Sequence, residues 1–106
     1  MNADTWTTAE KKLARELFER AASNEEAELI ADIKGRAAQL SDLDAVRGLQ
    51  AHIGSAVREF QVKYDFRYSQ LLFVFARLVR EGRLSRSELN RLSDDKLALV
   101  DRMLTL

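Results

Sequence analysis

Apolar residues recur every three or four positions along most of this chain, which is the spacing of one face of an α-helix. No segment shows the alternation of apolar and polar residues that is typical of a half-buried strand. The 106 residues include no proline and only four glycines, so no part resembles a linker or a low-complexity segment. We therefore expect one all-α domain, because a chain of this length has room for a single core.

Capping signals divide the helical pattern. Thr7 and Glu10 form a capping box, which predicts a helix start near Thr8. A second box at 23–26 leaves two alternatives, one long helix or two helices that meet there, and we favour one long helix. The pair Ser41-Asp42 predicts the start of the next helix.

The C-terminal part has equally clear boundaries. The most apolar stretch, 71–76, predicts a third helix central to the core, and Gly82 suits a left-handed cap after its end. Ser85 and Glu88 form another capping box, and Ser93 is expected to start the last helix.

Two features suggest surfaces that another protein covers. Gly48 and Gly54 each weaken the second helix by about 1 kcal/mol, so this helix is expected to rely on packing against a partner helix. Phe73 and Phe75 lie about 200° apart around a helix, so one should point inward while the other is available to a neighbour.

Composition excludes several functions. Seventeen basic residues balance seventeen acidic ones, which gives no overall field for nucleic acid or acidic lipid. The absence of cysteine excludes disulfides and thiolate chemistry and fits a reducing compartment. The N-terminus has no signal-peptide pattern, and the longest apolar run is far shorter than the roughly 20 residues of a membrane span. We expect a cytoplasmic protein.

No residue set supports catalysis or metal binding. His52 is the only histidine, and no residue at helical spacing from it would orient it or share a metal, so we expect a surface or interface residue. We interpret the acidic group on the first helix as a solvated face and not as a cation site; its members are Glu25, Glu26, Glu28 and Asp32. We expect no cofactor, and an enzyme or metal carrier is the least favoured hypothesis.

The C-terminal part is locally basic. Its arginines could grip phosphate or an acidic protein surface, or form a basic rim that complements the acidic N-terminal half, which we favour; they are Arg77, Arg80, Arg83, Arg86 and Arg91.

The segment 63–82 carries a distinctive series of motifs. It begins Lys63-Tyr64-Asp65, continues through Phe73-Val74-Phe75-Ala76 and ends Glu81-Gly82, with Trp6 and Leu17-Phe18 as supporting matches. In these motifs the chain resembles the fluorescence recovery proteins of cyanobacteria, from Trp6 to the C-terminus.

This resemblance implies a fold and a function. The fold is an all-helical homodimer, with dimerisation helices at about 8–62 and a helical head at about 63–106. The function is to bind photoactivated orange carotenoid protein, to speed its return to the orange form and so to end energy quenching. Such a protein is a regulator and not an enzyme.

The resemblance also suggests two sets of site residues. The dimer interface is assigned to Ile30, Ile33, Leu40, Val46, Leu49 and Ile53. Partner binding is assigned to the head, at Phe73, Asp65, Arg67 and Tyr68.

One family segment differs in this chain. The family's tryptophan, histidine, aspartate and arginine are replaced here by Arg47, Gln50, Ala51 and Val57, and a lysine of the last helix is replaced by Leu99. These changes favour an alternative, in which the chain is a divergent homologue that binds an unidentified protein partner in an organism without this photoprotection.

Overall fold

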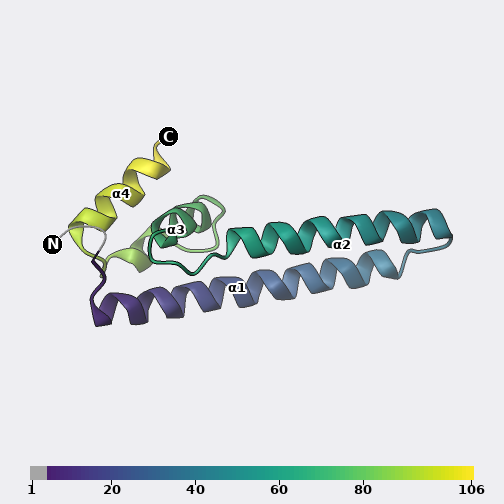
Figure 1. Ribbon diagram of the computed structural model, residues 1–106, viewed down its shortest axis with the longest axis horizontal. Coiled ribbons are helices and arrows are strands. Elements are labelled where there is room, and N and C mark those ends of the chain that lie inside the picture. The colour runs from purple at the N-terminus through teal and green to yellow at the C-terminus, as the bar shows by residue number, and fades with distance from the viewer. Residues whose placement is uncertain (1–4) are drawn as a thin grey trace. The chain divides into compact units, whose positions relative to one another are not determined.

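Helices make up nearly all of the regular structure. The computed structural model describes residues 5–106 (Figure 1). In this range the helices are α1 (Thr8–Ala37), α2 (Leu43–Lys63), α3 (Leu71–Arg80), the 3₁₀ helix η1 (Arg86–Leu89) and α4 (Asp94–Leu104), and no strand is present. The all-α prediction is confirmed. None of the described helices has the length and apolar character needed to cross a membrane.

The capping residues act as the sequence predicts. Glu10 N–H donates to Thr7 Oγ1 at 3.1 Å, and Thr7 N–H donates to Glu10 Oε1 at 3.0 Å. Asp42 caps α2, since its Oδ1 accepts a bond of 2.7 Å from Ala45 N–H, and Ser93 caps α4. The interior of α1 runs unbroken through 23–26, so the prediction of one long helix is confirmed.

Gly82 ends α3 in a left-handed conformation. Its φ is 77°, the only positive φ among the described residues. Gly82 N–H donates to Val79 O at 3.0 Å, and Arg83 N–H donates to Leu78 O at 2.8 Å. These paired bonds are the Schellman motif, which satisfies carbonyls that the helix end leaves open. The predicted role of Gly82 is confirmed.

The chain forms two compact units. We call the first the head unit, whose described part comprises residues 5–21 and 65–106, and the second the hairpin unit, which is Ala22–Tyr64. All of the fully buried apolar side chains belong to the head unit, and the largest are Leu71, Phe75, Leu78, Leu89 and Val100. The core of the described chain therefore lies in the head unit.

Helix α3 is the centre of the head unit, where it packs against α4. Phe75 is fully buried, whereas Phe73 on the same helix is 59% exposed. This difference follows from the rotation of about 200° between the two positions. The prediction that one phenylalanine points inward and the other outward is confirmed.

The hairpin unit has no comparable core. Its two antiparallel segments are the end of α1 and all of α2 (Figure 1). Over residues 22–64 the only buried side chain is that of Lys63, and no apolar side chain is buried. The apolar stripes that the sequence predicts on both helices are present, but within one chain they stay partly or fully exposed.

Two glycine substitutions should change stability in opposite directions. Gly82→Ala forces a Cβ into a positive φ and should lower the free energy of unfolding by about 1 kcal/mol. Gly35→Ala lies inside α1, where an added Cβ would meet no atom within 4 Å, and should raise it by up to about 1 kcal/mol. Urea unfolding followed by circular dichroism measures both, and equal effects of the same sign would contradict this account of Gly82.

Candidate functional site

A buried ion pair joins the starts of two helices in the head unit. Lys96 Nζ on α4 lies 3.2 Å from Glu10 Oε1 on α1, and both side chains are almost completely buried. The second oxygen, Glu10 Oε2, accepts a bond of 2.8 Å from Ser93 N–H, at the cap of α4. One carboxylate therefore caps its own helix and the start of α4 as well.

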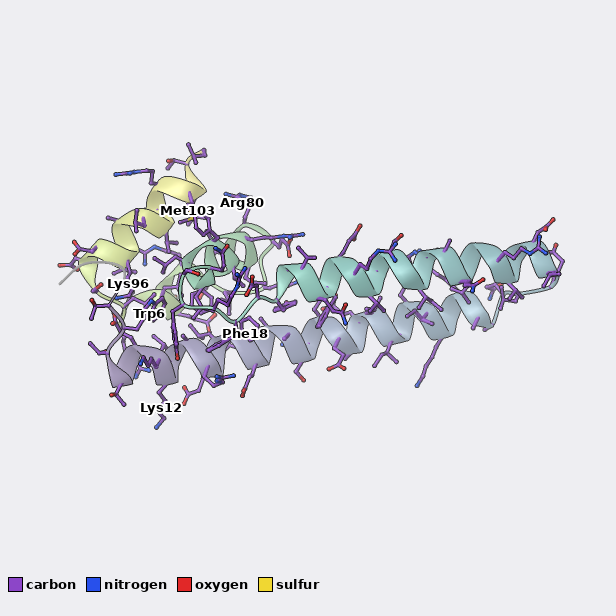
Figure 2. All side chains as sticks on the ribbon, in the orientation of Figure 1. Trp6, Lys12, Phe18, Arg80, Lys96 and Met103 are labelled. Carbon is purple, nitrogen blue, oxygen red and sulfur yellow. The ribbon has the colours of Figure 1, made fainter. Side chains whose placement is uncertain are left out.

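The N-terminal segment is attached to the same ammonium group. Lys96 Nζ donates to Thr5 O at 2.5 Å and lies 4.9 Å from the centre of the Trp6 ring. Figure 2 shows Lys96 and Trp6 close together where α4 begins. The lysine is 0% exposed, and its positive charge is compensated by a carboxylate, a carbonyl oxygen and an aromatic face.

The surroundings of Glu10 favour its charged form. Burial acts to raise its pKa, but bonds from the backbone N–H groups of Thr7 and Ser93 and from the Lys96 ammonium group hold the pKa below the ordinary value of 4.5. Glu10 is therefore a carboxylate at neutral pH, and its bonds join the starts of α1 and α4.

A row of aromatic rings continues from Trp6. Its ring centre lies 5.5 Å from that of Tyr68, Tyr68 lies 5.7 Å from Phe66, and Phe66 lies 4.9 Å from Phe18. The guanidinium of Arg15 lies 3.8 Å from the centre of the Phe66 ring. Edge-on contacts and cation–π contacts of this kind add to the stability of burial and fix the loop before α3.

The predicted partner-binding residues differ in how far other side chains engage them. Asp65 and Arg67 form an ion pair with each other, with Arg67 Nε 2.8 Å from Asp65 Oδ1, and the pair lowers the pKa of Asp65 and raises that of Arg67. Tyr68 is 40% exposed but packs in the aromatic row. The side chain of Phe73, on α3, is 59% exposed and takes part in none of the ring contacts among the described residues. Phe73 is therefore the most available of these side chains.

The predicted dimer residues all lie in the hairpin unit. Ile30 and Val46 are exposed, and the others are half-buried; these are Ile33, Leu40, Leu49 and Ile53. Leu40 and Leu49 line one hollow near the turn that joins α1 to α2. The role of these six residues in a dimer stays a prediction.

Polar links across the hairpin were not predicted. Asp32 on α1 accepts bonds of 3.0 Å from Arg36 and lies 2.9 Å from His52 Nε2 on α2. Sequence spacing did not predict the contact between His52 and Asp32, because it relates only residues on the same helix as His52, and Asp32 lies on the other helix. These contacts lower the pKa of Asp32, that from His52 most strongly.

The open end of the hairpin holds a second cluster. Glu25 Oε1 accepts bonds of 2.6 Å from Lys63 Nζ and 2.7 Å from Tyr64 Oη. Two members of the predicted acidic face, Glu25 and Asp32, therefore bind specific side chains of α2 or of the residue after it. Within 5–106 there is no group of three or more histidine, aspartate or glutamate side chains suited to a metal ion.

The arginines of the C-terminal part pair locally. Arg77 Nε lies 3.0 Å from Glu81, Arg86 Nε lies 2.6 Å from Asp101, and Arg80 donates to Met103 O at 2.7 Å (Figure 2). For these three the expectation that they complement the acidic N-terminal half was wrong. Neighbouring acids and a helix-end carbonyl within the head unit are simply closer.

Comparison with known proteins identifies the family. The family model described as photoprotection regulator fluorescence recovery protein matches residues 6–104. The chain belongs to the fluorescence recovery protein family. The fluorescence recovery protein of Synechocystis sp. PCC 6803 is 34% identical over 95 residues, which cover 90% of this chain and 87% of that protein.

Solved structures of the family share this fold. The fluorescence recovery protein of Fremyella diplosiphon has 33% identity and a TM-score of 0.88, with 96% of this chain and 100% of that chain covered. The Synechocystis structure has 32% identity, the same TM-score and the same coverage. The resemblance noted in segment 63–82 is therefore confirmed for the family and for the helical fold.

The Glu10–Lys96 pair should dominate the stability of the head unit. Glu10→Gln leaves a buried ammonium without its carboxylate and should lower the free energy of unfolding by about 3 kcal/mol at pH 7. Because folding lowers the pKa of Glu10, its contribution is fully present above the unfolded value and is lost as pH falls through the folded value.

Urea unfolding at pH 7 and at pH 3 tests this. The difference between wild type and Glu10→Gln should be large at pH 7 and clearly smaller at pH 3. Glu16→Gln, at an exposed position on the same helix, is the matched control and should change stability little at either pH. A difference that does not depend on pH would contradict the role of the charge.

Proposed function

We propose that this chain is a non-enzymatic regulator of photoprotection that binds photoactivated orange carotenoid protein and speeds its return to the orange form. The observation that carries the proposal is the family match over residues 6–104, whose family is described as a photoprotection regulator. The head surface and the hairpin fit such a role. We also propose the cytoplasm as its location, as expected from the sequence.

The hairpin unit supports assembly into a dimer. Its helices bury no apolar side chain within one chain, yet they expose large apolar ones, namely Ile30, Leu43, Val46, Val57 and Val62. An antiparallel helix pair without a core is unstable in water, because helices of this kind depend on tertiary packing. A second copy related by two-fold symmetry would cover both hairpins with the same surface.

The head unit supports binding of a second protein. Phe73 is 59% exposed on a helix whose opposite face is buried in the core, so its backbone position is fixed while its ring lies at the surface. Aromatic side chains, phenylalanine among them, are enriched in protein interfaces. Arg77, one turn further along α3, adds an exposed charge near it.

Acceleration sets a condition on how the partner is bound. A regulator that held only the activated form would slow its decay, because that form would be stabilised. The chain must therefore bind the transition state between the two partner conformations more tightly than the activated form. A rigid head that fits an intermediate arrangement of the partner meets this condition without any chemistry.

Four of the five replaced family residues named in the sequence analysis lie on one helix. Arg47, Gln50, Ala51 and Val57 lie on α2 in the hairpin unit, whereas Phe73 lies on α3 in the head unit. We propose that the head carries the essential contacts, so that activity persists with a changed hairpin surface. An inactive chain would instead favour an unidentified protein partner.

The recovery assay tests the function and Phe73 together. Photoactivated orange carotenoid protein is left in the dark with equimolar chain, and the return of the orange absorbance is followed. Wild type should accelerate the return, and Phe73→Ala should accelerate it clearly less, because loss of a hot-spot side chain weakens binding by about tenfold or more. Leu106→Ala, which removes another exposed apolar side chain, is the control and should behave as wild type.

The outcomes of this assay separate the hypotheses. Because Phe73 is mostly exposed, its replacement should leave the fold and the circular dichroism spectrum unchanged. No acceleration by a folded wild-type chain would reject the proposed partner. Equal acceleration by wild type and Phe73→Ala would reject the role of Phe73 alone.

A charge placed in the proposed interface should separate the subunits. Val46→Glu puts a carboxylate at an apolar position that is 44% exposed in one chain and is covered in the proposed dimer. Size-exclusion chromatography with light scattering should show a mass near that of two chains for wild type and near that of one for the variant. Ala98→Glu, at an exposed position on α4, should remain dimeric, and an unchanged mass for Val46→Glu would reject this interface.

A further inference from the structure

The ring of Tyr68 is held by three neighbours in the head unit. Its centre lies 5.5 Å from that of the Trp6 ring and 5.7 Å from that of the Phe66 ring, and the Lys11 ammonium group lies 5.3 Å from it. Trp6 is itself buried, so Tyr68 packs against a fixed group. These contacts restrict the rotation of the Tyr68 side chain before any other molecule binds.

The hydroxyl group of Tyr68 has no partner in the described part of the chain. It forms no hydrogen bond with residues 5–106, whereas the hydroxyl of the other tyrosine, Tyr64, donates to Glu25 Oε1 at 2.7 Å. Tyr68 is 40% exposed, and a tyrosine hydroxyl can both donate and accept a hydrogen bond. This hydroxyl is therefore available to a molecule that binds the head unit.

The Lys11 ammonium group beside this ring has no counter-ion among the described residues. Lys11 is exposed in the first turn of α1, and its ammonium group forms no ion pair within 5–106. Its neighbour Glu10 is buried and bound to Lys96, and the carboxylate of Asp65, in the loop that holds Tyr68, is bound by a neighbouring arginine. Two hydrogen-bond donors therefore lie close together at the surface without an acceptor from these carboxylates.

A carboxylate is the group that best matches these two donors. Its two oxygen atoms can accept bonds from a hydroxyl and from an ammonium group at the same time. An apolar side chain would cover both donors and leave them without bonds, and a basic one would be repelled by Lys11. The single positive charge also matches one carboxylate better than a phosphate group, whose charge is close to −2.

We propose that Tyr68 and Lys11 together bind a carboxylate side chain of the partner protein, a proposal that rests on the binding function put forward above. Tyr68 sets the position of the carboxylate, because its ring is already held in place, and Lys11 supplies the charge. The pair lies in the same unit as Phe73. The head unit then offers the partner an apolar contact and a charged one, and it selects an acidic position on the partner's surface.

Two substitutions that preserve packing test this proposal. Binding of photoactivated orange carotenoid protein under continuous illumination is measured by biolayer interferometry at about 50 mM and about 300 mM salt. Tyr68→Phe keeps the ring and removes only the hydroxyl, and should weaken binding about tenfold. Lys11→Met keeps an apolar stem and should weaken binding about fivefold at low salt but little at high salt.

Lys12→Met is the matched control for the loss of charge. Lys12 is exposed at the next position of α1, points away from that helix and has no contact with the Tyr68 ring (Figure 2). This variant should bind within about twofold of wild type at both salt concentrations. An equal loss for Lys12→Met and Lys11→Met would mean that only the overall charge matters, which would overturn the pair.

The double variant tests whether both donors bind one carboxylate. The combined loss of Tyr68→Phe and Lys11→Met should be smaller than the product of the two single losses, because removing one donor loosens the carboxylate from the other. Independent effects would contradict a shared acceptor. A loss for Tyr68→Phe with none for Lys11→Met would indicate an uncharged acceptor and would overturn the carboxylate.

The outcomes also separate this pair from the function. A wild-type chain that does not bind overturns the proposed function and the pair with it. Wild-type binding that Tyr68→Phe leaves unchanged overturns the pair and leaves the function in place. Circular dichroism spectra and urea midpoints should be the same for wild type and the single variants, since neither change removes a buried group, and this equality assigns the losses to binding.

Discussion

The carboxylate of Glu10 joins the start of α1 to the start of α4 within the head unit. It completes the capping box with Thr7, accepts the backbone N–H of Ser93 and balances the buried Lys96. Lys96 in turn holds Thr5 and lies over Trp6. Removing one charge from such a network leaves the other buried and unpaired, so its members depend on one another more than separate contacts would.

The two compact units are stabilised by different kinds of interaction. The head unit has a core built on α3, whereas the hairpin unit relies on helix-to-helix polar links at Asp32 and Glu25 and buries no apolar side chain. Exposed ion pairs each contribute at most about 1 kcal/mol, and the Asp32–His52 contact is half-exposed. The Glu25–Lys63 pair is largely buried, but a buried ion pair adds little net stability because burial removes both charges from water. If a second copy covers the hairpin, its folding is coupled to association and its stability rises with protein concentration.

The sequence predicted the features that depend on residues close together along the chain. It missed the contacts between residues far apart along the chain. The caps at Thr7, Ser93 and Gly82 involve atoms a few residues apart, so residue type and spacing were sufficient. The pairs Glu10–Lys96 and Asp32–His52 join different helices, and no local pattern encodes them. Periodicity also indicated which residues share a face of α1 and α2, but it could not show whether that face is covered. The family resemblance, and not periodicity, selected Phe73 over Phe75 as the outward ring.

The position of Trp6 has a spectroscopic consequence. It is the only tryptophan, it is buried in the head unit, and its ring lies against Tyr68 and the Lys96 ammonium group. Its emission therefore reports the integrity of this one cluster. The hairpin unit holds no indole, so loosening of α2 leaves the fluorescence signal unchanged until the head itself opens, and a melting curve recorded by this signal describes one unit of the chain.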